Sequence, residues 1–258
     1  MRTLTAVRRT PKANLRLGAT LAFVAGAVNA GGFLAIGRYT SHMTGIVSSM
    51  ADYLAVGQVA LALAALGGLL AFLFGAMTTA VLVNWARRRR LHSRYALPLL
   101  LEALLLLLFG LLGGNLDQAT ALLVPVTALV LCFVMGLQNA VITKLSRAEI
   151  RTTHVTGLVT DIGIELGKLV YVNVHRHQPL VLADRRKLKV HTLLFAMFFT
   201  GGVLGALGFS LVGYSTTVPL AALLFALCAA PMAIDARIRL RVMRRHDRER
   251  RRANPASR

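Results

Sequence analysis

The chain has 258 residues, of which 56% are hydrophobic and 16% are charged, whereas an ordinary soluble domain has about 25% charged residues. Its formal net charge is nevertheless +20, from 30 Lys and Arg against 10 Asp and Glu, and its mean hydropathy is +0.63. Long apolar stretches separate the basic blocks, which excludes a disordered chain, a soluble nucleic-acid-binding protein and a disulfide-stapled secreted domain. The composition predicts an all-α, polytopic membrane protein with one membrane domain.

Six stretches are long and apolar enough to cross a bilayer, because a helix rises about 1.5 Å per residue and the hydrocarbon core is about 30 Å thick. In chain order they are residues 17–36, 59–85, 96–113, 119–143, 192–214 and 217–236. Two further segments, 45–57 and 157–173, are shorter or more polar. We expect both to be re-entrant, entering the membrane and returning to the same side, although the 17 residues of the second could nearly span.

The basic residues indicate how the chain is oriented, since Lys and Arg near span ends mark the cytoplasmic side. Of the 30 Lys and Arg, 28 lie in five blocks, at residues 1–16, 87–94, 144–151, 176–189 and 237–258. All five blocks fall on one side, with both termini, if only the six long stretches cross. We therefore expect basic cytoplasmic tails at 1–16 and 237–258 that meet anionic lipid headgroups. Nucleic acid is not an expected partner, because the C-terminal run has no aromatic residues for stacking.

Two strings recur in the same order about 110 residues apart. FVAGAVNA at 23–30 aligns with FVMGLQNA at 133–140, and TSHMTGIV at 40–47 aligns with TTHVTGLV at 152–159. Each half, 17–114 and 115–236, then has three crossings, so the second half must be inverted relative to the first. The same recurrence argues against a signal peptide, the competing interpretation of the N-terminal stretch.

In each half, the residues best suited to bind a solute lie at the His-x-Thr-Gly junction, where a loop enters a short helix. There the Thr can cap the helix, the Gly allows close backbone approach, and the His adds a donor that can titrate near neutral pH. A helix N-terminus carries about +0.5 charge, so two of them meeting at the midplane would suit an anion or a carboxylate-bearing solute. The predicted binding residues are His42, Thr44, Gly45, His154, Thr156 and Gly157, with Asn29 and Asn139 of the preceding spans.

Other interpretations of these residues stay open at this point. The repeated junction is also consistent with a purely architectural role, and the two asparagines with hydrogen bonds that join helices. Asp161 and Glu165, four residues apart on one helix face, are candidates for ion coupling or for a self-neutralising surface at the cytoplasmic rim. We expect Glu102 to pair with the basic block at 87–94.

These strings also carry a resemblance. Ser-His-Met-Thr-Gly at 41–45, and Gln-Asn-Ala at 138–140 followed by Thr-Thr-His-Val-Thr-Gly at 152–157, are similar to the signature of the YoaK-like family of bacterial integral membrane proteins, over roughly residues 17–236. The resemblance implies a bacterial inner-membrane protein in a family of unknown function, with no catalytic residues to transfer. Members usually have Asn after the first Thr-Gly, where this chain has Ile46.

The leading functional hypothesis is a small-solute transporter or channel-like permease with a midplane site built from the two junctions. Six spans form a thin wall around a pathway, which favours a homodimer. The alternative is a non-transporting scaffold or sensor whose repeats are only structural. An enzyme is not expected, and neither is a metal or cofactor, because no His-Glu-x-x-His motif, Gly-x-Ser-x-Gly nucleophile elbow or phosphate-binding glycine loop occurs.

Overall fold

A computed structural model describes residues 11–37, 39–91, 93–114, 120–146, 153–173 and 179–253; most of these residues are helical, and none of them is in a strand. The elements are α1 (Pro11–Ile36), α2 (Met43–Ala55), α3 (Val59–Arg88), α4 (Ala96–Gly113), α5 (Thr120–Ser146), α6 (Val155–Val170), α7 (Arg185–Val212), the short 3₁₀ helix η2 (Gly213–Thr216) and α8 (Thr217–Ala253). The all-α fold class is therefore confirmed. The basic residues at positions 1–10 lie outside the described residues.

Five helical stretches are long and apolar enough to cross a membrane: Ala13–Ala35, Val59–Arg88, Ala96–Gly113, Val124–Lys144 and Arg185–Ile238. The last has 54 residues and contains α7, η2 and most of α8, so it folds back on itself rather than forming one rod. Gly213, at φ +63°, ends α7 in a backbone conformation that favours glycine.

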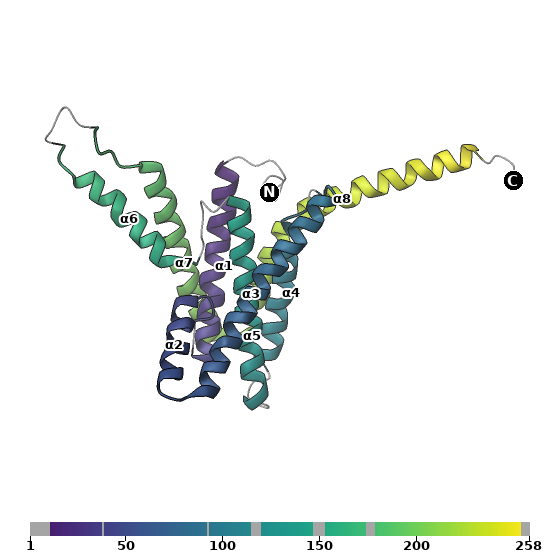
Figure 1. The fold of residues 1–258 in the computed structure, drawn as a ribbon. Helices are drawn as coiled ribbons and strands as arrows, with labels where there is room; N and C mark the ends of the chain where they lie inside the picture. Colours follow the sequence, from purple (N-terminus) through teal and green to yellow (C-terminus); the bar gives the residue numbers. More distant parts are fainter. Residues whose placement is uncertain are drawn as a thin grey trace.

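The long helices run alternately up and down, and the two short helices lie toward opposite ends of the bundle (Figure 1). Helix α2 packs against α3, and α6 packs against α7. Helix α1 packs against α7, while α5 packs against α3, so each half contributes a helix to the side of the other. Helices α4 and α8 pack against each other.

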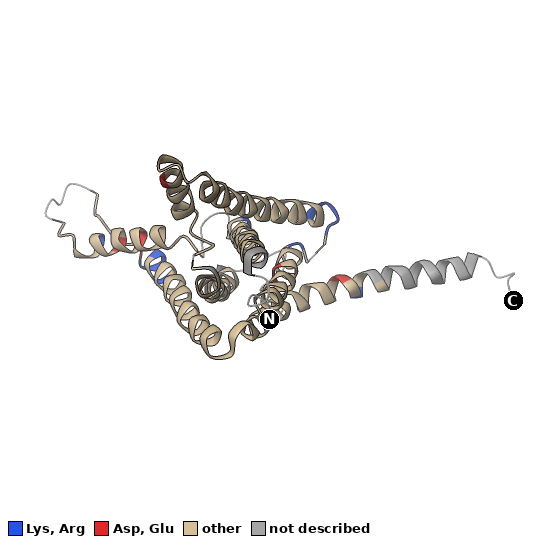
Figure 2. Cartoon of the chain, turned by 90° about the horizontal axis from the view of Figure 1, so that it is seen from below, with Lys and Arg blue, Asp and Glu red and all other residues tan. Residues whose placement is uncertain are grey.

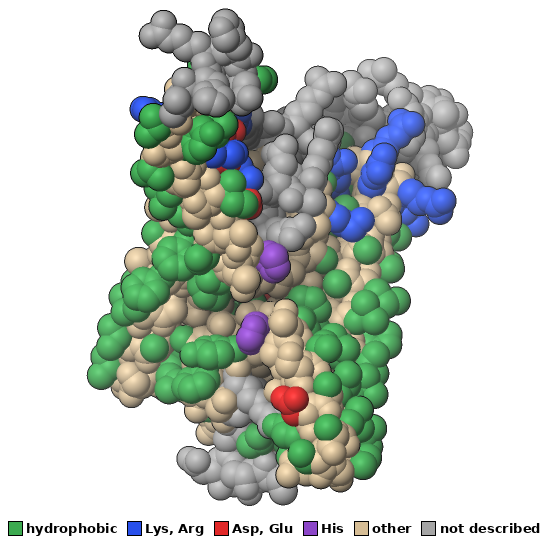
Figure 3. All heavy atoms as spheres, turned by 60° about the vertical axis from the view of Figure 1, so that its left-hand side comes forward, with side chains coloured by type: hydrophobic (Ala, Val, Ile, Leu, Met, Phe, Trp, Pro, Cys, Tyr) green, Lys and Arg blue, Asp and Glu red, His purple; other side chains and the backbone are tan. Residues whose placement is uncertain are grey.

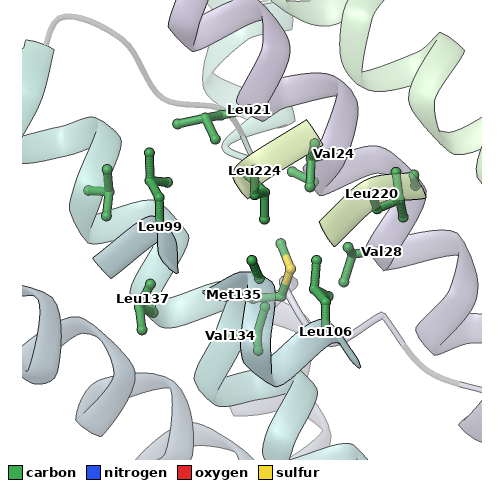
Figure 4. Packing of buried hydrophobic residues seen from close by; sticks show 14 of the residues in the cluster. Leu21, Val24, Val28, Leu99, Leu106, Val134, Met135, Leu137, Leu220 and Leu224 are labelled. Atoms are coloured by element: carbon green, nitrogen blue, oxygen red, sulfur yellow. The ribbon is translucent and has the colours of Figure 1, made fainter. Parts of the chain in front are cut away.

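The core lies where α1, α4, α5 and α8 meet, and its side chains point into one apolar cluster (Figure 4). Leu21, Leu99, Met135 and Leu224 are among its fully buried members. Burying a side chain of this size is worth about 1.5–3 kcal/mol in water, but between helices in lipid the gain comes from close packing instead. Much of the outer surface is also apolar, as on α3, where Leu63 and Phe74 are exposed.

Close helix crossings depend on glycines at equivalent places in the two halves. A Cβ on Gly26 of α1 would collide with the carbonyl oxygen of Phe198 on α7, and one on the equivalent Gly136 of α5 would collide with the carbonyl oxygen of Phe72 on α3. Small residues let helix backbones approach closely in membranes. Gly201 of α7 approaches the carbonyl oxygen of Phe23 on α1 in the same way, so small residues keep the α1–α7 and α3–α5 crossings close.

Charged side chains gather at particular places. Lys and Arg side chains concentrate at one end of the molecule (Figure 3), at the end of α3 and the beginning of α7 among other places. Acidic residues lie beside basic ones on α6 and the start of α7, at the left of Figure 2. Helix α3, by contrast, carries no charged side chain from Val59, at its opposite end, to Asn84.

Candidate functional site

The two His-x-Thr-Gly junctions have the same local structure. His42 is the N-cap of α2, at φ −91° and ψ 71°, and His154 is the N-cap of α6, at φ −84° and ψ 60°. In neither case does the N-cap side chain accept a hydrogen bond from the first turn of its helix. Thr44 and Thr156 stand inside the first turn rather than before it. The expectation that these threonines cap their helices is therefore wrong, because the helices begin two residues earlier than a threonine cap requires.

Each histidine ring lies over the glycine three residues after it. A Cβ on Gly45 would stand 2.5 Å from Nδ1 of His42, and a Cβ on Gly157 would collide with Nδ1 of His154. Any larger residue at either glycine would push the imidazole out of its position. The close approach expected at these glycines is thus made by the histidine of the same junction.

An asparagine of the preceding helix holds each junction. Asn29 Oδ1, on α1, accepts a hydrogen bond of 3.0 Å from the Ser41 hydroxyl, and the Ser41 backbone amide is 3.4 Å from the same oxygen. Asn139 Oδ1, on α5, accepts a hydrogen bond from the Thr153 hydroxyl. Ser41 and Thr153 occupy equivalent places directly before the two histidines. Neither hydroxyl residue is among the predicted binding residues, although the aligned strings contain both.

One cavity of about 1060 Å³ brings the two junctions together. It opens on a lateral face of the bundle, where histidine side chains are visible at mid-height between the two short helices (Figure 3). Its polar lining comes from the junctions and the helices behind them: Asn29, Ser41, His42, Thr44, Asn139, Thr143, Thr153, His154 and Thr156. Of the eight predicted binding residues, six line this cavity, and Gly45 and Gly157 lie behind their histidines.

Apolar residues complete the cavity wall. Phe72 of α3, Phe198 and Phe199 of α7, and Phe33 and Leu34 of α1 all line it. Among the described residues that line the cavity there is no Asp, Glu, Lys or Arg. The site therefore combines two groups of neutral donors and acceptors with an aromatic wall.

Asp161 and Glu165 lie elsewhere, in a network between α6 and α7. Lys187 Nζ is 2.9 Å from Asp161 Oδ1, and His191 Nδ1 is 3.7 Å from Asp161 Oδ2. Lys168 Nζ is 2.9 Å from Glu165 Oε1. Each carboxylate therefore has a cationic neighbour, so the cluster neutralises itself, but Glu165 is buried rather than at the surface. Neither carboxylate is among the residues lining the cavity.

The same network forms the N-terminus of α7. Asp184 is the N-cap, and its Oδ1 accepts bonds of 2.9 Å from the backbone amides of Arg186 and Lys187. The Asp184 amide in turn donates to Glu165 Oε2 over 2.7 Å. The Lys168 ammonium and this amide hold the pKa of the Glu165 carboxyl below its usual value. The Lys187 amide, followed by that of Arg186, lowers the pKa of Asp184 against the opposing effect of desolvation.

Glu102 differs from its expected role. It is fully buried on α4, and among the described residues neither carboxyl oxygen has a hydrogen-bond partner, so the expected pairing with the basic block at 87–94 is wrong. The block belongs to the end of α3 and the following turn, whereas Glu102 faces the interior of the bundle. No group of three or more His, Cys, Asp or Glu side chains within the described part of the chain is arranged to hold a metal ion.

Comparison with known proteins adds a family. A family model described as "Protein of unknown function (DUF1275)" matches residues 17–230, nearly the whole helical bundle. No curated protein and no solved structure gives a significant match to the chain.

Proposed function

We propose that this chain, which belongs to the DUF1275 family, is a permease for a small organic anion, with a carboxylate as the expected headgroup. One observation carries the proposal: a single cavity is lined by both repeated junctions, His42 with Thr44 and His154 with Thr156. A purely architectural repeat has no need to leave two equivalent helix starts open to one cavity.

The membrane topology that we propose has six crossings, α1, α3, α4, α5, α7 and α8, with α2 and α6 as re-entrant helices. The equivalent packing of α2 on α3 and of α6 on α7, and the reciprocal packing of α1 on α7 and of α5 on α3, support an inverted repeat. In this arrangement the two short helices start at the midplane and run to opposite membrane surfaces (Figure 1). Discontinuous helices of this kind bind substrates in many transporters.

The electrostatics of the site favour a single negative charge. Each helix N-terminus carries about +0.5 charge, so the two together match one anionic group. Backbone amides of the first turns, such as those of Thr44 and Thr156, and the two imidazoles are the donors that would bind it. A dianion would exceed this match, because no Lys or Arg of the described residues lines the cavity to neutralise a second charge.

The orientation and location of the protein follow from its basic residues. The Lys- and Arg-rich end of the bundle would face the cytoplasm of a bacterial inner membrane, together with both termini, and would meet anionic headgroups. The cavity opens on the side of the bundle, and in the proposed homodimer a second copy packs on that side. The ion-coupling role of Asp161 and Glu165 stays a prediction, to be separated from their evident role in joining α6 to α7.

Uptake into proteoliposomes tests the proposal. Benzenesulfonate is a suitable probe, because it stays ionised and therefore leaks slowly through lipid. We expect protein-dependent uptake that the double variant His42→Ala/His154→Ala abolishes. The matched control is Ser48→Ala/Thr160→Ala, because these two residues are exposed at equivalent places on α2 and α6 and do not line the cavity. Uptake that survives the double variant unchanged would refute the site, and the absence of both uptake and binding would favour the scaffold or sensor.

A further inference from the structure

Part of the cavity wall is aromatic. Phe72 and Phe198 come from α3 and α7, the helices that pack against α5 and α1, and Phe199 follows on the same turn of α7. Small hydrophilic anions gain nothing from such a wall. A cavity of about 1060 Å³ is also far larger than an inorganic anion needs.

The mouth of the cavity has the same character as its wall. Phe33, Leu34 and Phe199 line the cavity and are 44%, 53% and 62% exposed. These residues belong to α1 and α7, so in the proposed topology the mouth faces sideways at the level of the hydrocarbon. A solute that passes an apolar rim loses its hydration there, which favours one whose bulk is itself apolar.

We propose that the solute is amphipathic, a monocarboxylate whose head lies at the His42 and His154 junctions and whose apolar chain or ring lies against Phe72, Phe198 and Phe199. This inference rests on the proposed function and narrows its substrate class. It assigns the aromatic residues to specificity and the junctions to charge. Short hydrophilic acids would then bind at the same place, only more weakly.

A homologous series of straight-chain carboxylates tests the inference directly. The probes are acetate, butyrate and hexanoate, with binding to the purified full chain measured by calorimetry. Burying one methylene tightens binding by about fourfold, so hexanoate, with four more methylenes, should bind about 250-fold more tightly than acetate. A Kd that does not change along the series would overturn the amphipathic assignment but leave the anion site in place. Failure of every probe to bind would overturn both proposals.

Two phenylalanines one turn apart on α7 separate specific binding from partitioning into detergent. Phe199 lines the cavity, whereas Phe195, 36% exposed, does not. Phe199→Ala should weaken hexanoate binding about 10-fold and leave acetate binding unchanged, while Phe195→Ala should change neither. If Phe199→Ala fails to fold, Phe33→Ala takes its place in the test, and hexanoate binding should again weaken about 10-fold. Equal effects of Phe199→Ala and Phe195→Ala on hexanoate would overturn the assignment.

Discussion

Replacing Gly45 by alanine is expected to weaken anion binding without unfolding the protein. The added Cβ would stand 2.5 Å from His42 Nδ1, whereas ordinary contacts begin near 3.4 Å, so the imidazole must move by about 0.9 Å. The colliding atom belongs to a side chain, which can rotate away while the helix stays in place. An off-rotamer imidazole costs about 0.5–1.5 kcal/mol, and alanine returns up to about 1 kcal/mol through its helix propensity. The free energy of unfolding should therefore change by less than about 1 kcal/mol.

The effect on binding should be much larger. A hydrogen bond to a charged group contributes about 1.5–3 kcal/mol, so losing the His42 contact should raise the Kd for an anion about 10- to 150-fold. Gly163→Ala is the matched control, because a Cβ there meets nothing within 4 Å and the residue is exposed on α6. It should leave the Kd unchanged and stabilise the helix by up to about 1 kcal/mol.

Calorimetric titration with benzoate, together with a thermal melt of each variant, measures both quantities. An unchanged Kd for Gly45→Ala would show that the position of His42 is irrelevant to binding. An equal loss of affinity in Gly163→Ala would show that the effect is general to glycine replacement. Either result refutes the reasoning about the junction.

Three further changes test other parts of the account. Asn139→Leu removes the acceptor of the Thr153 hydroxyl. We expect the free energy of unfolding to fall by about 1–3 kcal/mol and benzoate to bind more weakly. Wild-type stability and affinity would contradict the conclusion that Asn139 positions the second junction. Glu165 and Asp184 have a lower pKa in the folded protein than in the unfolded chain, so their stabilisation is present above the unfolded pKa of about 4 and is lost as pH falls through the folded pKa. The melting temperature of the wild type should therefore fall more steeply below about pH 4 than that of a Glu165→Gln variant, and parallel curves would contradict this. Gly136→Val forces α3 and α5 apart and should cost about 1–3 kcal/mol or more, visible as a lower Tm; an unchanged Tm would contradict the close crossing.

Much of the fold follows from hydropathy alone, because each long apolar run has few alternatives to a helix in lipid. The stretch Ala96–Gly113 has the bounds expected of it, whereas α7 begins at Arg185, before the apolar run at 192. Asp184 caps that helix and its basic first turn pairs with α6, so capping and ion pairs extend α7 beyond its apolar part. Neither the Asp184 cap nor the ion pairs can be predicted from hydropathy.

The candidate site was only partly predictable. The repeated strings identify both junctions because identical local sequences adopt identical local structure. They do not reveal that Phe72 and Phe198 complete the wall, since these residues come from other helices and look like ordinary lipid-facing side chains. The predicted pairing of Glu102 with the basic block at 87–94 is wrong for a related reason. The direction in which its side chain points depends on how α4 is rotated within the bundle, and hydropathy does not determine that rotation.

The central claim is that the two repeats are inverted, and cysteine accessibility tests it most directly. Cys132 and Cys228 are buried, and they would be replaced by alanine before single cysteines are introduced at Gln58, after α2, and at Val172, after α6. A membrane-impermeant maleimide should label Gln58→Cys only from outside intact cells and Val172→Cys only in inside-out vesicles. Labelling of both cysteines from the same side of the membrane would contradict the inverted repeat and the midplane site built on it.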